Sequence, residues 1–323
     1  MGDDKITVVT GAAGFVGRHV VQHLREQGAT VRASDRGHES KGLFDGLGVE
    51  YVAADLTRPE TLRPVFDGRI DRVFHLGAVC NFSTPYEVLA PINVLAVARV
   101  TELARKAEVR CFVHVSSTSV YGRYRGSPFT EQSPREPQED YGRSKQAGED
   151  EVFRAMARGL PAIVCRPCTV YGPGCTDGAG KAFSRRTAIP AIPGSGRQKL
   201  ANVRVEDVAR ALVHLSGAAG AVGQAFNIAD DSQPTLEEAL TLAARTFGAK
   251  PPRVHLPLGL LAVLARAEGF IAKRRHRIPD LEADAVRYLH DDYVVDASKL
   301  AATGFVLRYP DFASSLAQLR TRP

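Results

Sequence analysis

The amino-acid sequence predicts an α/β protein, built on a doubly wound parallel sheet with a smaller C-terminal domain. Three observations lead to this prediction. Short runs rich in Val, Ile and Phe alternate with helical patterns in the first half, and a glycine-rich turn follows the first of these runs. After about residue 172 the pattern changes to Pro/Gly-rich loops and separate helices. We therefore expect one domain over residues 1–172 and a second mainly over residues 173–323, with segments near 201–230 returning to the sheet of the first.

The strand candidates are mostly continuous apolar runs, as expected for parallel strands that are buried on both faces. They lie at residues 5–10, 30–35, 49–55, 71–78, 111–117, 162–167 and 223–230. Helical patterns separate several of them, which is typical of right-handed βαβ units; these patterns cover 16–27, 91–107 and 141–158. Residues 205–215 and 235–248 predict two further helices, and Thr235 is a suitable N-cap for the second.

Composition limits the classes of function. A hydrophobic content of 44% supports a substantial core, and the net charge of +6 is mild for 323 residues. We recognise neither a dense basic stripe nor a nucleic-acid-binding module, so no nucleic-acid partner is expected. No apolar run reaches ~18 residues, which argues against a membrane-spanning helix.

The five cysteines favour a reducing compartment. Their number is odd, and the first residues, MGDDKITVVT, carry no secretory signal pattern. We therefore expect free thiols and a cytoplasmic protein. Cys165 and Cys168 form a C-x-x-C, but no second Cys or His pair lies near them in the sequence. Ordinary buried thiols are favoured over a zinc site, and no metal is expected.

A glycine-rich turn lies between the first strand candidate and the first helix. The segment VVTGAAGFVGRHVV carries Gly11, Gly14 and Gly17 at a G-x-x-G-x-x-G spacing. Glycine lets the backbone turn sharply and approach a pyrophosphate, while a helix N-terminus offers N–H groups. The flanking strand and helix favour a dinucleotide-binding (Rossmann) turn over a merely structural one, with Phe15 and Val16 in the same loop.

The acid at the end of the next strand bears on the choice of cofactor. Asp35 would accept hydrogen bonds from ribose hydroxyls and repel a 2′-phosphate, which favours NAD over NADP. The neighbouring Arg36 complicates this prediction, because a guanidinium partly accommodates a phosphate. Asp55 ends the third strand, where its side chain would meet the adenine amino group.

A tyrosine and a lysine stand four residues apart in the segment EDYGRSKQAGE. On a helix, Tyr141 and Lys145 share one face. By itself the pair fits a surface contact as well as a general acid whose pKa is lowered by a neighbouring cation. The strand before this helix ends in Ser116 and Ser117, which add hydroxyl groups.

Together these motifs resemble the extended short-chain dehydrogenase/reductase family, in particular its NAD-dependent epimerase/dehydratase and 3β-hydroxysteroid dehydrogenase-like branch. The similarity covers the whole chain. The matching segments are TGAAGFVG, DL at 55–56, HLGA at 75–78, SSTSVYG, YGRSK, RPCTVYGPG, VRVEDVARA and FNIAD, in the family's order. Gly77 stands where the family usually has alanine, a small change that leaves backbone contacts open.

The resemblance implies a catalytic trio. Tyr141 would be the proton donor or acceptor for the substrate oxygen, and Ser117 would hydrogen-bond the reacting oxygen. Lys145 would bind the nicotinamide ribose and lower the tyrosine pKa. Hydride would pass between a substrate carbon and the nicotinamide. Besides the residues already named, the resemblance assigns to the cofactor Leu56, Leu76, Gly77, Ala78, Asn93 and Pro167.

The substrate is less determined by these motifs. For the substrate side we expect Cys80, Thr169, Lys181 and Arg204. Sugar-nucleotide epimerases commonly place an arginine that grips the diphosphate where this chain has Leu200. Several basic residues in the expected substrate loops either suit a phosphate or carboxylate or are simply solvated; they are Lys181, Arg185, Arg186, Arg197 and Lys199.

The leading hypothesis is an NAD-dependent dehydrogenase or reductase for a secondary alcohol or ketone on a largely apolar, steroid- or lipid-like molecule. The alternative is a nucleotide-sugar 4-epimerase or dehydratase with tightly bound NAD. A 4,6-dehydratase is less favoured. That branch typically carries a Thr-Asp-Glu triplet where this chain has Ser117, Thr118 and Ser119. An NAD-binding regulator without turnover is disfavoured by the intact trio.

Two segments bear on partners. Residues 256–277, LPLGLLAVLARAEGFIAKRRHR, are apolar and then basic. A packed helix with a charged end is the favoured interpretation, and contact with a membrane surface is the alternative. The helices near 91–107 and 141–158 carry apolar faces, which often pair between subunits in this family, so we expect a homodimer.

Overall fold

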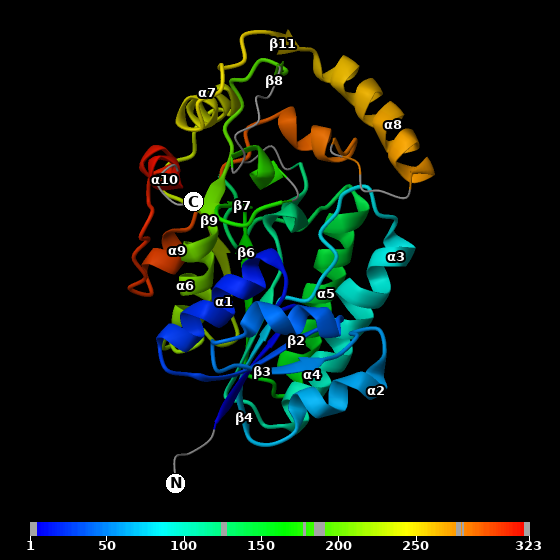
Figure 1. Ribbon diagram of the computed structural model, residues 1–323, viewed down its shortest axis with the longest axis vertical. Coiled ribbons are helices and arrows are strands. Elements are labelled where there is room, and N and C mark those ends of the chain that lie inside the picture. Colours follow the sequence, from blue (N-terminus) through cyan, green and yellow to red (C-terminus); the bar gives the residue numbers. More distant parts are fainter. Residues whose placement is uncertain are drawn as a thin grey trace.

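Seven parallel strands form the central sheet, in the order β10-β6-β5-β4-β1-β2-β3 (Figure 1). The computed structural model describes residues 5–123, 128–176, 179–183, 191–275, 279 and 281–319. The strands are β1 Ile6–Thr10, β2 Thr30–Asp35, β3 Glu50–Ala53, β4 Ile70–His75, β5 Cys111–Val115, β6 Ala162–Pro167 and β10 Ala225–Ile228. In the register of the sheet, Val8 of β1 lies opposite Arg32 of β2 and Val73 of β4. The predicted fold class, a doubly wound parallel sheet, is confirmed.

Helices cover both faces of this sheet (Figure 1). α1 (Phe15–Glu26) and α6 (Val205–Leu215) share a buried apolar cluster with one face. α4 (Ala96–Lys106) and α5 (Asp140–Ala157) share a second cluster with the other face. The shorter helical segments of this half are η1 His38–Phe44, α2 Pro59–Leu62, η2 Arg63–Phe66, α3 Tyr86–Ala90, η3 Pro91–Leu95 and η4 Thr118–Tyr121. With apolar cover on both sides, the strands need no polar face, which is why their sequences are continuous apolar runs.

The helix predicted over 91–107 is interrupted. It begins earlier, as α3, and the segment Pro91–Leu95 forms a turn of π-helix before α4. Pro91 lacks an N–H group, so the regular α-helical ladder is broken at this point. The bulged turn lies against α5, where a Cβ on Gly148 would come within 2.4 Å of the Asn93 carbonyl oxygen. Glycine at position 148 therefore permits the close approach of the two helices.

Most of the C-terminal elements gather beyond the carboxyl ends of the strands, while α9 (Ser298–Ala301) packs beside the start of β10 (Figure 1). They are β7 Thr169–Tyr171, η5 Ala179–Phe183, β8 Ile192–Pro193, β9 Asn202–Arg204, α7 Leu236–Thr246, β11 His255–Leu256, α8 Leu258–Arg274, η6 Ala285–Leu289, α9 Ser298–Ala301 and α10 Phe312–Leu319. α7 begins with a capping box in which Thr235 and Glu238 bond each other's backbone N–H, so the predicted N-cap is confirmed. No helix in the described ranges is both long and apolar enough to cross a bilayer.

Candidate active site

The parallel topology brings the predicted functional residues to one edge of the sheet. Gly11 follows β1, Asp35 ends β2, Gly77 follows β4, Ser117 follows β5 and Pro167 ends β6. The strand order reverses direction between β1 and β4, and ligands of doubly wound sheets bind outside the carboxyl ends at such a switch point. Residues far apart in the chain therefore share one region.

The backbone of the glycine turn is open to contact with a ligand, and the positions Gly11 and Gly17 have no space for a side chain of their own. Gly11 adopts a left-handed conformation, with φ of 68°, and a Cβ there would lie 2.5 Å from the Gly77 nitrogen. A Cβ on Gly17 would lie 2.1 Å from the Gly11 carbonyl oxygen. Gly14 is the exposed N-cap of α1, and no side chain caps this helix. A bare helix N-terminus beside a tight turn is the cradle that a dinucleotide pyrophosphate needs.

Asp35 is held beside this turn. Its Oδ2 accepts a hydrogen bond from the Ala13 nitrogen at 3.0 Å, and its Oδ1 accepts one from the Arg36 nitrogen at 2.8 Å. The Arg36 side chain is exposed. Asp55 accepts hydrogen bonds from the nitrogen and hydroxyl of Thr57, and these bonds lower the pKa of its carboxyl group. Hydrogen bonds thus fix both carboxylates at the strand ends.

Tyr141 lies at the first turn of α5 and is 5% exposed. Its hydroxyl group interacts with Ser117 and with the thiol of Cys80. The pKa of Tyr141 is raised well above its ordinary value, mainly by burial and then by Cys80, while the Ser117 hydroxyl acts in the opposite direction. The expectation of a pKa lowered by the neighbouring lysine is therefore wrong for this structure, since burial dominates.

Lys145 is buried one helical turn farther along. Its Nζ donates a hydrogen bond to the Val115 carbonyl oxygen at 2.8 Å, at the end of β5. Burial lowers the pKa of Lys145 to about 8, although Cys80 and Glu149 act to raise it. The ammonium group is thus directed toward the strand end that carries Ser117. Tyr141, Lys145 and Ser117 meet as predicted, and Cys80 joins them.

Two buried histidines lie beneath this group. His75 and His114 stack with their ring centroids 5.7 Å apart, and the His75 Nδ1 lies 2.7 Å from the Thr10 hydroxyl oxygen. Burial, together with the Lys145 charge, lowers the pKa of His75 to about 3 and also lowers that of His114. Both rings are neutral at physiological pH, so Lys145 supplies the positive charge here.

Asn93 serves the loop that carries Cys80. Its side-chain amide exchanges two hydrogen bonds with the Val79 backbone, each 2.9 Å long, and donates a third to the Ser144 hydroxyl. Every one of these partners belongs to the protein, and Asn93 is 1% exposed. The side chain that the resemblance assigned to the cofactor therefore fixes the loop after β4 against α5.

Three site residues have no counterpart in the prediction. Phe82 packs edge-on against Tyr141, with ring centroids 5.1 Å apart, and against Tyr288 of η6 at 5.4 Å. Glu139 is the N-cap of α5, bonding the Gly142 nitrogen, and it also accepts a hydrogen bond from the Tyr288 hydroxyl. An acid just before a helix was a visible capping signal. The partnership with Tyr288, 149 residues away, had no local signal.

The residues expected on the substrate side divide into two groups. Cys80 is exposed beside Tyr141, and Thr169 and Lys181 are half-buried in β7 and η5. Arg204, by contrast, is fully buried; it pairs with Glu206 at 2.9 Å and donates to the Ser315 carbonyl oxygen. Its guanidinium also stacks over the Tyr309 ring. These contacts give the expected substrate role of Arg204 no support. Arg185 and Arg186 lie outside the described residues.

None of the five cysteines forms a disulfide, and all except Cys80 are buried. Burial raises the pKa of both Cys165 and Cys168. Among the residues that the structure describes, no cluster of three or more His, Cys, Asp or Glu side chains is arranged to hold a metal ion.

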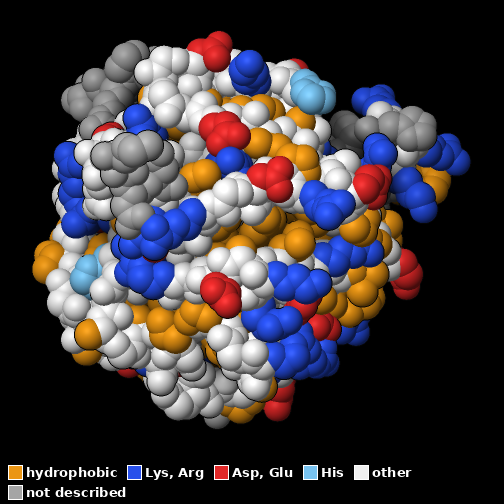
Figure 2. Space-filling model, turned by 90° about the horizontal axis from the view of Figure 1, so that it is seen from below, with side chains coloured by type: hydrophobic (Ala, Val, Ile, Leu, Met, Phe, Trp, Pro, Cys, Tyr) orange, Lys and Arg blue, Asp and Glu red, His pale blue; other side chains and the backbone are white. Residues whose placement is uncertain are grey.

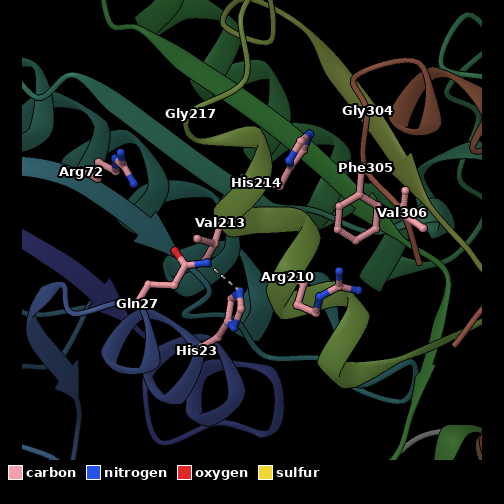
Figure 3. A pocket seen from close by; sticks show the side chains of 10 residues that line it. All are labelled: His23, Gln27, Arg72, Arg210, Val213, His214, Gly217, Gly304, Phe305 and Val306. Atoms are coloured by element: carbon pink, nitrogen blue, oxygen red, sulfur yellow. Dashed lines mark hydrogen bonds between the residues drawn. The ribbon is translucent and has the colours of Figure 1, made fainter. Parts of the chain in front are cut away.

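A separate cavity of about 610 Å³ lies between α1, α6 and the Gly304–Val306 loop (Figure 3). His23 and Gln27 line it from the end of α1, and Arg210 and His214 line it from α6. Arg72 of β4 also lines it, near the amino end of that strand. The catalytic group lies at the carboxyl ends, so this cavity is not part of the candidate active site.

The fold and the site together define a Rossmann-type, dinucleotide-dependent enzyme. The model of the NAD dependent epimerase/dehydratase family matches residues 7–229, and the chain belongs to this family. It is accordingly an NAD-dependent enzyme of the epimerase/reductase type.

Relatives with different substrates resemble the chain about equally. A UDP-glucose 4-epimerase from Mycolicibacterium smegmatis is 33% identical over 274 residues, which is 78% of this chain and 86% of that protein. A ceramide reductase from Caulobacter vibrioides is 31% identical over 257 residues, which is 78% of this chain and 74% of that protein. Among solved structures, MoeE5 in complex with UDP-glucose and NAD superposes with a TM-score of 0.75 at 26% identity, over 97% of each chain.

Proposed function

We propose that this protein is an NAD-dependent dehydrogenase or reductase that acts on a secondary alcohol or ketone of a largely apolar, steroid- or lipid-like substrate. The observation that carries this proposal is the environment of Tyr141. Phe82 contacts its ring, and Cys80 and Ser117 interact with its hydroxyl group. Apolar and weakly polar groups of this kind suit a hydrocarbon skeleton that presents one oxygen to the tyrosine.

An aromatic wall extends this apolar surface. Phe82, Tyr288 and Tyr293 form a series of edge-on contacts, with centroids about 5.4 Å apart in both steps. Glu282 accepts hydrogen bonds from the Phe82 and Ser83 nitrogens, which ties the Cys80–Phe82 loop to the C-terminal half. The wall therefore belongs to both halves of the chain, as expected of a substrate pocket between them.

The surroundings of Leu200 support the same choice. Its side chain packs against the apolar cluster of Tyr171, Phe183 and Leu236. The neighbouring Lys199 is exposed, and Arg204 is paired with Glu206 as described above. Binding a diphosphate requires cations that offset its buried charge. Lys199 and Arg204 are therefore not placed to meet a diphosphate at Leu200, and we propose that a sugar nucleotide is not the substrate.

In the proposed mechanism, the cofactor bound at the glycine turn would supply a hydride as NADH or accept one as NAD+. For ketone reduction, Ser117 and Tyr141 hydrogen-bond the carbonyl oxygen, and Tyr141 gives that oxygen its proton as the carbon receives hydride. The raised pKa of Tyr141 keeps the proton on the phenol until then. For alcohol oxidation the proton moves the other way. The positive charge of Lys145 would stabilise the tyrosinate as it forms, against the larger effect of burial.

For the cofactor, we propose NAD rather than NADP, because the fixed carboxylate of Asp35 lies beside the glycine turn and would repel a 2′-phosphate. The glycine turn with Phe15 and Val16, Leu56 with Asp55, Leu76 with Ala78, and Pro167 remain the proposed contacts of the cofactor. Asn93 is proposed to act on it indirectly, through the loop after β4.

The second candidate is a nucleotide-sugar 4-epimerase. It is favoured by the 33% identity with the UDP-glucose 4-epimerase and by the likeness to MoeE5 with UDP-glucose and NAD. In that case Lys181 would be a candidate to bind the diphosphate of the substrate, because it lies in η5 beside β7.

A substrate panel distinguishes the two candidates. Sterols, long-chain acyl ketones and UDP- and dTDP-sugars would be offered with NAD or NADH, and the NADH absorbance followed. We expect net oxidation or reduction with at least one apolar substrate. An epimerase gives no net absorbance change, so the sugar products would be analysed by chromatography. Conversion of a UDP-sugar, with no apolar substrate turned over, would establish the second candidate.

A further inference from the structure

α8 (Leu258–Arg274) carries an apolar stripe on its outer face. Its members recur at the three- and four-residue spacing of one helix face, and each is about half exposed: Leu260 49%, Val263 57%, Leu264 48%, Phe270 58% and Ile271 45%. The stripe runs over about 16 Å at the usual helical rise. Large aliphatic and aromatic side chains grouped in this way mark an interaction surface, unlike single exposed ones.

The opposite side of α8 is the one that packs on the protein. Leu261 and Ala265 are buried there against Val286 of η6, with Leu281 and Leu289 beside them. The helix is therefore apolar on two sides, although only one of them is needed for folding. Figure 1 shows α8 at the edge of the molecule, away from the central sheet, so its outer face is open.

The exposed charged side chains of α8, and that of Arg275 directly after it, are all basic. Arg266, Lys273, Arg274 and Arg275 are exposed, and the Arg274 guanidinium lies over the Phe270 ring at 4.4 Å. The single acid within α8, Glu268, is half-buried and accepts a hydrogen bond from the Leu281 nitrogen. In Figure 2 the projection on the right, where the end of α8 lies in Figure 1, carries predominantly basic side chains. An apolar stripe with a basic end complements an anionic lipid surface.

We propose that α8 docks this protein on a lipid bilayer with anionic headgroups, its outer stripe entering the interface and its basic end contacting the headgroups. A second copy of the chain fits this surface less well. Two α8 helices packed in parallel would bring their basic ends together. Packed antiparallel, each basic end would meet the Leu258–Val263 end of the other helix, which carries no acid to pair with it. The bilayer supplies both complements at once.

This surface is connected to the catalytic group by direct contacts. η6 packs under α8 through Val286, and two residues farther on Tyr288 contacts Phe82 and Glu139 at the site. A membrane-docked α8 would place the pocket wall close to the bilayer, where apolar substrates reside. The docking proposal itself rests on α8 alone and stands whatever the substrate proves to be.

Co-sedimentation with lipid vesicles tests the proposal without any substrate. The full-length protein would be mixed with phosphatidylcholine vesicles, with and without about 30% phosphatidylglycerol. We expect binding to the anionic vesicles, weakened by salt. The triple variant Val263→Gln/Leu264→Gln/Phe270→Gln should lose it. The matched control is Leu43→Gln/Val222→Gln/Val306→Gln, which removes three side chains of 49%, 48% and 73% exposure elsewhere and should bind like the wild type.

The charged end is tested separately with Lys273→Gln/Arg274→Gln, for which binding should weaken by roughly fivefold per charge removed. Thermal unfolding of each variant checks that it is folded. Wild-type protein that stays in the supernatant with anionic vesicles overturns the proposal, as does an α8 triple variant that binds normally. A wild-type dimer that the α8 triple variant converts to a monomer, without vesicle binding, would assign the stripe to a second copy instead.

Discussion

Tyr141 is the residue on which the proposed chemistry depends. Replacing it with Phe removes the transferable proton but keeps the buried ring against Phe82. We expect Tyr141→Phe to lower kcat by about 10²–10⁴-fold, the usual contribution of a general acid–base group, while NAD still binds. Steady-state kinetics and cofactor titration measure the two effects. Tyr86→Phe, which removes a hydroxyl from α3, is the matched control, and a wild-type rate in Tyr141→Phe would exclude the mechanism.

Asp35 is proposed to set the cofactor preference. Removing its carboxylate in Asp35→Ala takes away the repulsion of a 2′-phosphate and the hydrogen bond with the Ala13 nitrogen. The ratio of kcat/KM for NADP to that for NAD should therefore rise, partly through weaker use of NAD. Wild-type protein that already prefers NADP would show that the exposed Arg36 decides the preference, and Arg36→Ala would then reverse it.

The sequence predicted single site residues well where their roles depend on local spacing. The positions of Tyr141 and Lys145 on one helix, and of Ser117 at a strand end, could be read directly. The direction of the Tyr141 pKa could not, because it depends on burial and on Cys80, 61 positions earlier in the sequence. The contacts of Arg204 could not be predicted for the same reason, since Glu206, Ser315 and Tyr309 come together around it only in the folded chain.

At the scale of elements, the strands and helices follow from local patterns. The predicted strands at 30–35 and 162–167 match β2 and β6, and α6 covers the predicted 205–215. The π-helical turn at Pro91–Leu95 was missed, because its geometry depends on the fit of Asn93 against Val79 and α5. Apolar periodicity reports which face is buried, and it carries no information on such a local change of helix type.

α5, the element that carries Tyr141 and Lys145, is anchored to β6 by a buried ion pair. Arg166 donates two hydrogen bonds to Glu149, 2.8 and 2.7 Å long, and both side chains are almost fully buried. Glu149→Ala leaves the buried Arg166 guanidinium without its carboxylate partner and should reduce the free energy of unfolding by about 3–5 kcal/mol. Urea unfolding measures this change. Glu151→Ala, which breaks the surface pair with Arg154, should cost less than about 1 kcal/mol. Equal effects of the two substitutions would contradict the anchoring role.

At the scale of the whole molecule, we expect two subunits. The helical face formed by α3, η3, α4 and α5 exposes Val88 (57%) and Leu95 (51%), both large apolar side chains. Light scattering at micromolar concentration should give the mass of a homodimer. The variant Val88→Glu/Leu95→Glu should be a monomer, because a dimer would have to bury the two new carboxylates in its interface. A wild-type mass of 34.9 kDa would count against the assembly.

The central claim is that the site at Tyr141 accepts an apolar alcohol or ketone and not a sugar nucleotide. Calorimetric titration of the NAD-loaded protein with UDP tests it most directly, because neither Lys199 nor Arg204, two described cations near Leu200, is placed to hold the diphosphate. We predict no UDP binding at micromolar concentrations, while a sterol or long-chain acyl ketone binds and is turned over with the cofactor. Micromolar binding of UDP, with no apolar compound turned over, would contradict the claim and identify the protein as an epimerase.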